Sequence, residues 1–111
     1  MSCSCKNLQI ARGSTFSFTL SLPEEMDISD AKQVWVTFTQ NGKEKINKSI
    51  EDVTIDVNKI IVTLTQEETL SLHTGSAEMQ TRILTHDDTS LVQYPIIDWE
   101  VVPILKEGVI K

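Results

Sequence analysis

Hydrophobic and polar residues alternate most clearly along residues 77–102, and this stretch predicts a long β-hairpin. The first arm places five residues on one face: Ala77, Met79, Thr81, Ile83 and Thr85. In the second arm, residues 97–101 alternate between apolar and acidic side chains, and Pro95 marks a bulge or a switch between sheets. A period of two is typical of a strand that is buried on one face. Turn-forming residues at 86–90 favour a tight connection between the arms, so we expect this hairpin to organise an all-β domain.

The same alternation recurs through the first half of the chain. Residues 16–22 alternate strictly, and residues 34–38 repeat the pattern. The Asn-Gly pair at 41–42 predicts a two-residue hairpin turn because both residues tolerate positive φ. The Asn-Lys pair at 58–59 is a second turn candidate. The residues at 60–64 are mostly β-branched, which favours a strand over a helix.

These elements predict an immunoglobulin-like antiparallel β-sandwich of about seven strands. A partly closed barrel is the competing architecture. The Thr-Gln-Glu-Glu sequence at 65–68 fits a capping box and predicts one short helical turn near residues 65–72. A chain of 111 residues is long enough for one modest core. We therefore expect a single domain over residues 8–111, preceded by an N-terminal tail over residues 1–7 that is a candidate for flexibility.

Charge and hydropathy narrow the classes of partner and location. The formal charge of −6 argues against nucleic acid and against an anionic membrane surface, because both require a basic protein surface. No apolar run approaches the roughly 20 residues that span a bilayer. The first ten residues lack the basic segment and apolar core of a secretion signal. We expect a protein made in the bacterial cytoplasm, with no membrane partner.

Candidate reactive residues are few, and we interpret each of them as structural. Cys3 and Cys5 are the two cysteines of the chain, whereas a structural zinc site needs about four ligands at recognisable spacing. We interpret them as free thiols, with an intermolecular disulfide as a minor alternative. His86-Asp87-Asp88 is interpreted as turn chemistry, and Glu67-Glu68 as acidic residues that favour a helix start. No nucleophile-elbow pattern surrounds His73. We therefore predict no metal, no cofactor and no enzymatic activity.

A resemblance extends over residues 8–110. Five stretches carry it in this order: ARGSTFSFTLSL, VWVTFTQNGK, IIVTLTQEETLSL, AEMQTRILTHDD and ILKEGVI. Together they resemble a family of small proteins from phages and prophages of Gram-positive gut bacteria, similar to the immunoglobulin-like N-terminal domain of phage upper baseplate proteins. The resemblance implies a non-enzymatic virion or tail-associated structural protein, acting as a baseplate, neck or fibre-anchoring adaptor. Its implied partners are other phage structural proteins and further copies of itself, as a homo-oligomer.

Two alternatives belong to other functional classes. One is a carbohydrate-binding or cell-surface-binding module, although aromatic content is only 5% and such sites usually cluster aromatics. The other is a small intracellular regulator that binds another protein.

Five residues are candidates for an interface. Trp35 is out of phase with the apolar face of its own strand, and a large aromatic residue on the wet side is a typical interface anchor. Leu84 is an apolar residue on an otherwise polar face. Leu105, Val109 and Ile110 form an apolar C-terminal segment, which either completes an edge strand of its own domain or reaches onto a neighbour.

Overall fold

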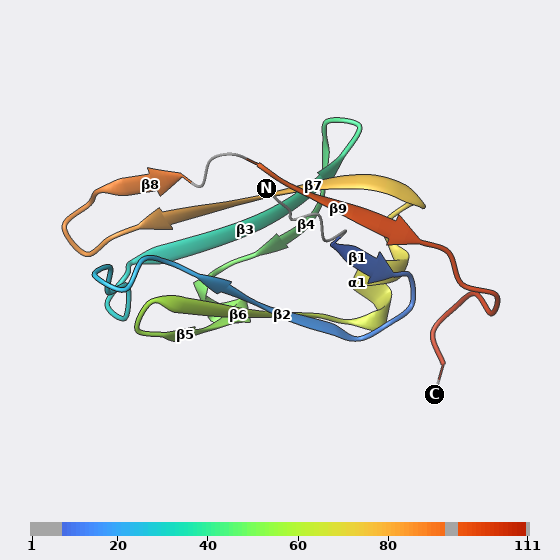
Figure 1. The fold of residues 1–111 in the computed structure, drawn as a ribbon, viewed down its shortest axis with the longest axis horizontal. Coiled ribbons are helices and arrows are strands. Elements are labelled where there is room, and N and C mark those ends of the chain that lie inside the picture. The colour runs from blue at the N-terminus through green and yellow to red at the C-terminus, as the bar shows by residue number, and fades with distance from the viewer. Residues whose placement is uncertain (1–7, 93–95, 111) are drawn as a thin grey trace.

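The chain folds into two β-sheets that face each other across one apolar core (Figure 1). The computed structural model describes residues 8–92 and 96–110. In chain order the elements are β1 (Gln9–Ala11), β2 (Phe16–Ser21), β3 (Gln33–Gln40), β4 (Lys43–Lys48), the 3-10 helix η1 (Ile50–Asp52), β5 (Val53–Asp56), β6 (Lys59–Leu64), α1 (Gln66–Leu70), β7 (Gly75–Leu84), β8 (Ser90–Val92) and β9 (Ile97–Val102). The larger sheet has the order β1-β9-β7-β3-β4, with β8 also paired to β7, and the smaller has the order β2-β6-β5.

The predicted all-β, immunoglobulin-like sandwich is confirmed, with nine strands in the described residues in place of about seven. The short helical turn is confirmed as α1. Within the described parts of the chain, every strand pair is antiparallel except β1 with β9, which run parallel with Ile10 opposite Val101. The predicted tail over residues 1–7, which contains Cys3 and Cys5, lies outside the described residues.

The predicted 77–102 hairpin is present, but its second arm is split into two strands. β7 is ten residues long, and both β8 and β9 pair along the same edge of it. β9 pairs with the first half of β7, and β8 pairs with the second half. The proposed irregularity at Pro95 lies outside the described residues. Because β3 pairs with the other edge, β7 is a central strand of the larger sheet.

Side chains that alternate inward from both sheets fill the core, as the period of two predicts. From the larger sheet, β3, β7 and β9 contribute the fully buried residues Val34, Val36, Phe38, Met79 and Val101. Trp99 stands at the centre of an aromatic cluster, with ring centroids 5.5 Å from Phe16, 5.1 Å from Phe18 and 6.3 Å from Phe38. This cluster joins β2 of the smaller sheet to β3 and β9 of the larger one, so it holds the two layers together.

The helix α1 is fixed by its cap and by an ion pair with the larger sheet. Thr65 accepts a hydrogen bond from the Glu68 backbone N–H, and the Glu68 carboxylate accepts one from the Thr65 N–H, as the predicted capping box requires. Lys48 of β4 donates to Glu68 Oε1 at 2.6 Å, and its ammonium side chain is only 10% exposed. This ion pair therefore connects α1 to β4, the edge strand of the larger sheet.

The turn between β5 and β6 is displaced by one residue from the predicted Asn-Lys pair. Val57 and Asn58 form the connection, and Val57 has a φ of +55°. A left-handed conformation is unfavourable for a β-branched residue. Two hydrogen bonds join Asn58 to Leu22. The Asn58 side-chain amide donates to the Leu22 carbonyl oxygen at 2.8 Å, and the Leu22 N–H donates to the Asn58 carbonyl oxygen at 2.8 Å. Anchoring of Asn58 to the loop after β2 thus shifts the positive φ onto Val57.

We expect Val57→Asn to stabilise the fold by about 1 kcal/mol, because asparagine tolerates the left-handed region at lower energy than valine. Val57 is 50% exposed, so its side chain loses little burial in the exchange. Urea unfolding followed by circular dichroism measures the change. Val92→Asn, at a strand residue that is also 50% exposed, is the control and should not be stabilised. Equal or lower stability of the Val57 variant would contradict the strain.

Candidate functional site

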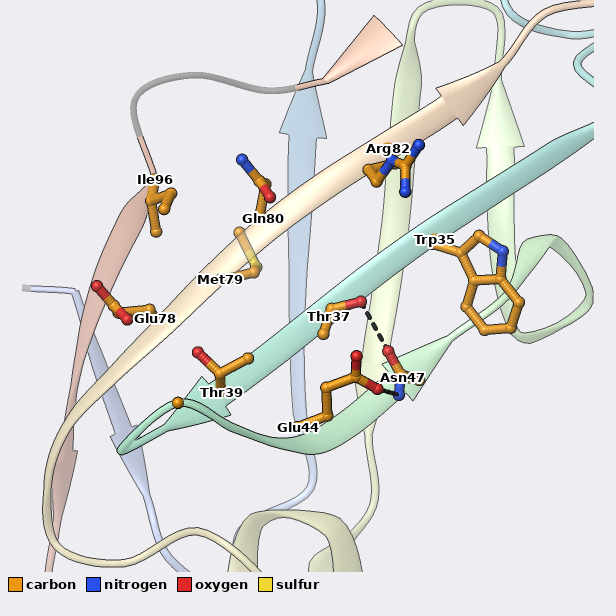
Figure 2. Close-up of a pocket in the computed structure, with 11 residues that line it drawn as sticks. Trp35, Thr37, Thr39, Glu44, Asn47, Glu78, Met79, Gln80, Arg82 and Ile96 are labelled. Atoms are coloured by element: carbon orange, nitrogen blue, oxygen red, sulfur yellow. Dashed lines mark hydrogen bonds between the residues drawn. The ribbon is translucent and has the colours of Figure 1, made fainter. Parts of the chain in front are cut away.

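The outer face of the larger sheet carries an open groove of about 650 Å³ over β3, β4 and β7 (Figure 2). Antiparallel sheets commonly expose one face to solvent, and in this protein the groove lies on that solvent-exposed face. The side chains that border the groove are mainly polar, with one exposed tryptophan. They include Trp35, Thr37, Thr39, Glu44, Asn47, Glu78, Gln80, Arg82 and Ile96.

Strand register arranges the centre of the groove in three rows. Trp35 is opposite Arg82, Thr37 is opposite Gln80, and Thr39 is opposite Glu78. Each row pairs an outward residue of β3 with an outward residue of β7, since alternate side chains share a face. Arg82 and Glu78 lie four residues apart on β7, which corresponds to roughly 13 Å along the strand. The groove therefore has a cationic, aromatic end and an acidic end.

Hydrogen bonds fix the β4 side of this groove. Thr37 Oγ1 donates to Asn47 Oδ1 at 2.7 Å, and Asn47 Nδ2 donates to Glu44 Oε1 at 2.8 Å (Figure 2). The side chains of Arg82 and Glu78 are exposed and make no hydrogen bond or ion pair with another described residue. Their charges are consequently available to a molecule that covers this face.

Trp35 lies where the sequence places it, on the polar face of β3, and it is 42% exposed. Its role in an interface stays a prediction. The alternation along residues 77–85 predicts that Glu78 and Arg82 share the polar face of their strand, but it does not place them, or Glu44, on the same surface as Trp35. The signal for two of them was present, because residues 78 and 82 are polar positions of the same alternating strand. The pairing of β3 with β7, which brings them beside Trp35, has no local sequence signature.

The other four interface candidates lie away from the groove. Leu84 is the last residue of β7, is partly buried and pairs with Gln33. Leu105, Val109 and Ile110 are all exposed, and Leu105 is fully so. Figure 1 shows the C-terminal segment at the end of the sandwich that carries α1, whereas β3 begins at the opposite end. Their roles as interface residues stay predictions.

The C-terminal segment forms no strand in the described residues, and side chains hold it instead. Glu107 accepts two hydrogen bonds from Arg12 Nη1, at 2.6 and 2.7 Å. Arg12 also donates to the Leu70 and Leu72 carbonyl oxygens at the end of α1, at 3.0 and 2.8 Å. The Ile110 backbone exchanges two hydrogen bonds with the Gln66 side chain. The segment thus packs on its own domain.

The His86-Asp87-Asp88 stretch is a turn, as predicted. Thr85 and Thr89 close it with backbone and hydroxyl hydrogen bonds, and Asp88 takes the left-handed conformation with a φ of +67°. A hydrogen bond from the Thr85 hydroxyl lowers the pKa of the exposed Asp87. His86 Nδ1 lies 3.4 Å from Asp30 Oδ2. Within residues 8–92 and 96–110, no three His, Cys, Asp or Glu side chains gather closely enough to hold a metal ion.

Comparison with known proteins supports the fold and no closer relationship. No protein-family model matches the chain, and no curated protein matches it as a relative. Among solved structures, the crystal structure of CopC from Methylosinus trichosporium OB3b superposes with a TM-score of 0.58. The two share 12% sequence identity, and the match covers 92% of this chain and 89% of the CopC chain. An identity this low shows a shared fold alone.

The prediction of a phage virion protein is therefore wrong. The solved structure found to match is that of CopC, which is not a baseplate domain, and no sequence comparison points to a phage family. The virion location is not supported either, and the predicted phage partners stay an untested prediction. Four of the five stretches that carried the resemblance consist of strands with the turn or short helix beside them, and ILKEGVI forms no strand. Such features are common to β-sandwiches and do not identify a lineage.

The comparisons also give no specific support to a carbohydrate-binding module or to an intracellular regulator. Among the described residues, no helix has both the length and the apolar character that a bilayer crossing requires.

Proposed function

We propose that this protein is a non-catalytic β-sandwich module that associates with a second copy of itself through the outer face of its larger sheet. The observation that carries the proposal is the register of the groove, in which Arg82 and Glu78 flank Gln80 symmetrically on β7. The proposal includes both the predicted homo-oligomer and the predicted lack of enzymatic activity.

A two-fold arrangement makes this face complementary to itself. Consider a two-fold axis that lies between the larger sheets of the two copies, parallel to the sheet planes, perpendicular to the strands and level with Thr37 and Gln80. Such an axis reverses the strand direction of the second copy. Arg82 of each copy then faces Glu78 of the other, because the two residues are equally distant from Gln80. Such an isologous contact uses each pair twice, as in most homodimers.

Side-chain size suits the same arrangement. Facing sheets pack about 10 Å apart, a gap that long side chains such as arginine and glutamate span from opposite sides. Trp35 of one copy falls over the row that contains Thr39 of the other, where the short threonine leaves room for the indole. Exposed aromatic residues in such positions are typical anchors of protein interfaces.

Charge reversal on the two flanking residues tests the proposal. We expect the wild type to form a dimer in sedimentation equilibrium at roughly 0.15 M salt, where repulsion between chains of charge −6 is screened. Arg82→Glu or Glu78→Arg alone should give monomers, because each places like charges opposite one another. An equimolar mixture of the two variants should restore a dimer, since every facing pair is again opposite in charge.

Matched controls carry the same charge changes on the smaller sheet. Lys59→Glu corresponds to Arg82→Glu, and Asp56→Arg corresponds to Glu78→Arg; residues 56 and 59 are exposed at the β5–β6 hairpin. Both controls should remain dimeric. A wild type that stays monomeric at the highest soluble concentration would refute the proposal, as would a mixture of the two groove variants that remains monomeric.

A further inference from the structure

The strand β2 lies at one edge of the smaller sheet, and its outer edge has no partner strand among the described residues. At the end of its ladder with β6, the Leu22 N–H donates to the carbonyl oxygen of Asn58, which the strand register places directly opposite. Hydrogen-bonded pairs alternate along an antiparallel ladder, so the backbone groups of Ser17, Thr19 and Ser21 point away from β6. No backbone hydrogen bond within the described residues engages them. Each of these residues therefore presents one N–H and one C=O at the free edge.

The other edge strands in the described part of the chain are protected against pairing. β1 and β8 have three residues each, and β5 has four. β4 is as long as β2, but it carries the charged residues Lys43, Glu44, Lys45 and Lys48. Short length and charged side chains, lysine above all, are common means by which proteins block an exposed edge. β2 has six residues with no charge and no proline, so its edge is open to another strand.

An apolar cavity of about 330 Å³ lies between the two sheets beside this edge. Leu20 and Leu22 contribute to one wall, and Leu91 and Val92 of β8 contribute to the opposite wall. None of the residues that line the cavity is charged. Uncharged side chains can therefore enter it, whereas a charged group would lose its hydration without compensation. Since β2 and β8 are both edge strands, the cavity lies at the margin of the sandwich.

We propose that β2 binds an extended segment of another protein, which pairs antiparallel with the free edge and inserts apolar side chains into the cavity. The exposed backbone groups recur every second residue, or roughly every 6.8 Å, and a β-strand matches that spacing. Every second side chain of the added strand points toward the core, where the cavity lies. Strand addition to a free sheet edge is a general mode of peptide recognition.

A second copy of this chain fits the site less well. Two β2 strands could pair edge to edge, but Phe16, Phe18 and Leu20 of the second copy pack against its own core. Those side chains are consequently not available to fill the cavity of the first copy. A segment of another protein has no such constraint. This site is separate from the groove on the outer face of the larger sheet.

A peptide that alternates hydroxyl-bearing and apolar residues tests the proposal. The probe is the blocked peptide KTVTLSVSK, and the scrambled peptide KVLVTTSSK is the control for composition and charge. Fluorescence anisotropy of labelled peptides measures binding to the wild type. We expect the scrambled peptide to bind about tenfold more weakly or worse, because its apolar residues no longer share one face of a strand. Absence of binding by the alternating peptide at its highest soluble concentration would overturn the proposal.

Methylation of the peptide amides tests the backbone pairing itself. In an antiparallel pair, the peptide residues that bond to the edge of β2 are the threonines and serines, whose side chains face solvent. N-methylation of these residues should weaken binding about tenfold or more, because several hydrogen bonds are lost. N-methylation of the apolar residues modifies amides that point away from β2 and should have a much smaller effect. Equal affinity of the two methylated peptides would overturn the proposal.

Substitution of Thr19 gives a readout on the protein. Thr19→Pro removes the central N–H of the free edge, and proline is tolerated in an edge strand where its nitrogen faces away from the ladder. Affinity for the alternating peptide should fall about tenfold or more, whereas Thr19→Ala keeps the N–H and should bind like the wild type. If Thr19→Pro does not fold, the methylated peptides decide.

The Arg82→Glu variant separates this site from the proposed dimer. It should bind the alternating peptide like the wild type, so a failure of the groove dimer and a failure of the β2 site are distinguishable. Self-association of Arg82→Glu that the additional Thr19→Pro substitution abolishes would show that β2 pairs with a second copy. That result would overturn the proposal.

Discussion

Replacing Trp99 by alanine should destabilise the protein by about 3–5 kcal/mol, the range for removal of a large aromatic residue from a core. Trp99 is 6% exposed, and its ring contacts the rings of Phe16, Phe18 and Phe38, which come from both sheets. A loss of this size is a large part of the roughly 5–15 kcal/mol by which domains are stable. The variant should therefore unfold at much lower urea concentration or fail to fold.

Two substitutions make this result specific to the cluster. In the Arg82→Glu background, where no dimer is expected to contribute, Trp35→Ala removes the same side chain from the exposed face and should change stability by less than about 1 kcal/mol. Trp99→Phe keeps a ring in the cluster and removes the indole N–H, which is buried without a partner among the described residues. It should be far milder than Trp99→Ala. Circular dichroism across a urea series measures all three, and equal losses for both alanine variants would contradict the assignment of Trp99 as the link between sheets.

The second large effect is expected at the ion pair between Lys48 and Glu68. Lys48→Ala should reduce stability by about 1.5–3 kcal/mol at pH 7, the usual range for a hydrogen bond to a charged group. Glu68 would then be left partly buried without its cation. In the double variant with Glu68→Gln, much of the loss should be recovered, because no unpaired charge remains.

The same pair predicts a pH dependence. Burial raises the pKa of Glu68, but the hydrogen bonds from Lys48 and from the Thr65 N–H outweigh burial and lower the pKa below its ordinary value of 4.5. A lowered pKa in the folded state contributes stability above the ordinary value, and this contribution is lost as pH falls through the folded value. The stability difference between the wild type and Lys48→Ala should therefore shrink below about pH 4.5.

Unfolding in urea at pH 7 and at pH 3.5 measures the dependence, and an NMR titration follows Glu68 directly. In Lys48→Ala the pKa of Glu68 should move upward, since burial remains and the strongest compensating hydrogen bond is gone. Lys45→Ala, on the same strand, is the control and should show no such change. A pH-independent difference between the wild type and Lys48→Ala would contradict the role of this ion pair.

Local sequence determined the elements of this fold and the side of each strand that is buried. Alternation along residues 16–21, 34–38 and 77–84 correctly predicts the inward faces, and the Asn41-Gly42 turn and the α1 cap follow from local hydrogen bonding. These features depend on residues within a few positions of one another. The prediction of phage origin failed because the same local features are shared by sandwiches in general.

Tertiary structure alone decided which faces meet and what lies between them. The pairing of β3 with β7 places Arg82 beside Trp35. The local sequence around each residue does not predict this pairing. Likewise, the alternation of its strand predicts that Thr81 is buried, but only the packing of the whole domain leaves its hydroxyl without a hydrogen-bond partner among the described residues. Alternation fixes the orientation of a side chain within its own strand, whereas strand order and sheet stacking are set by long-range packing.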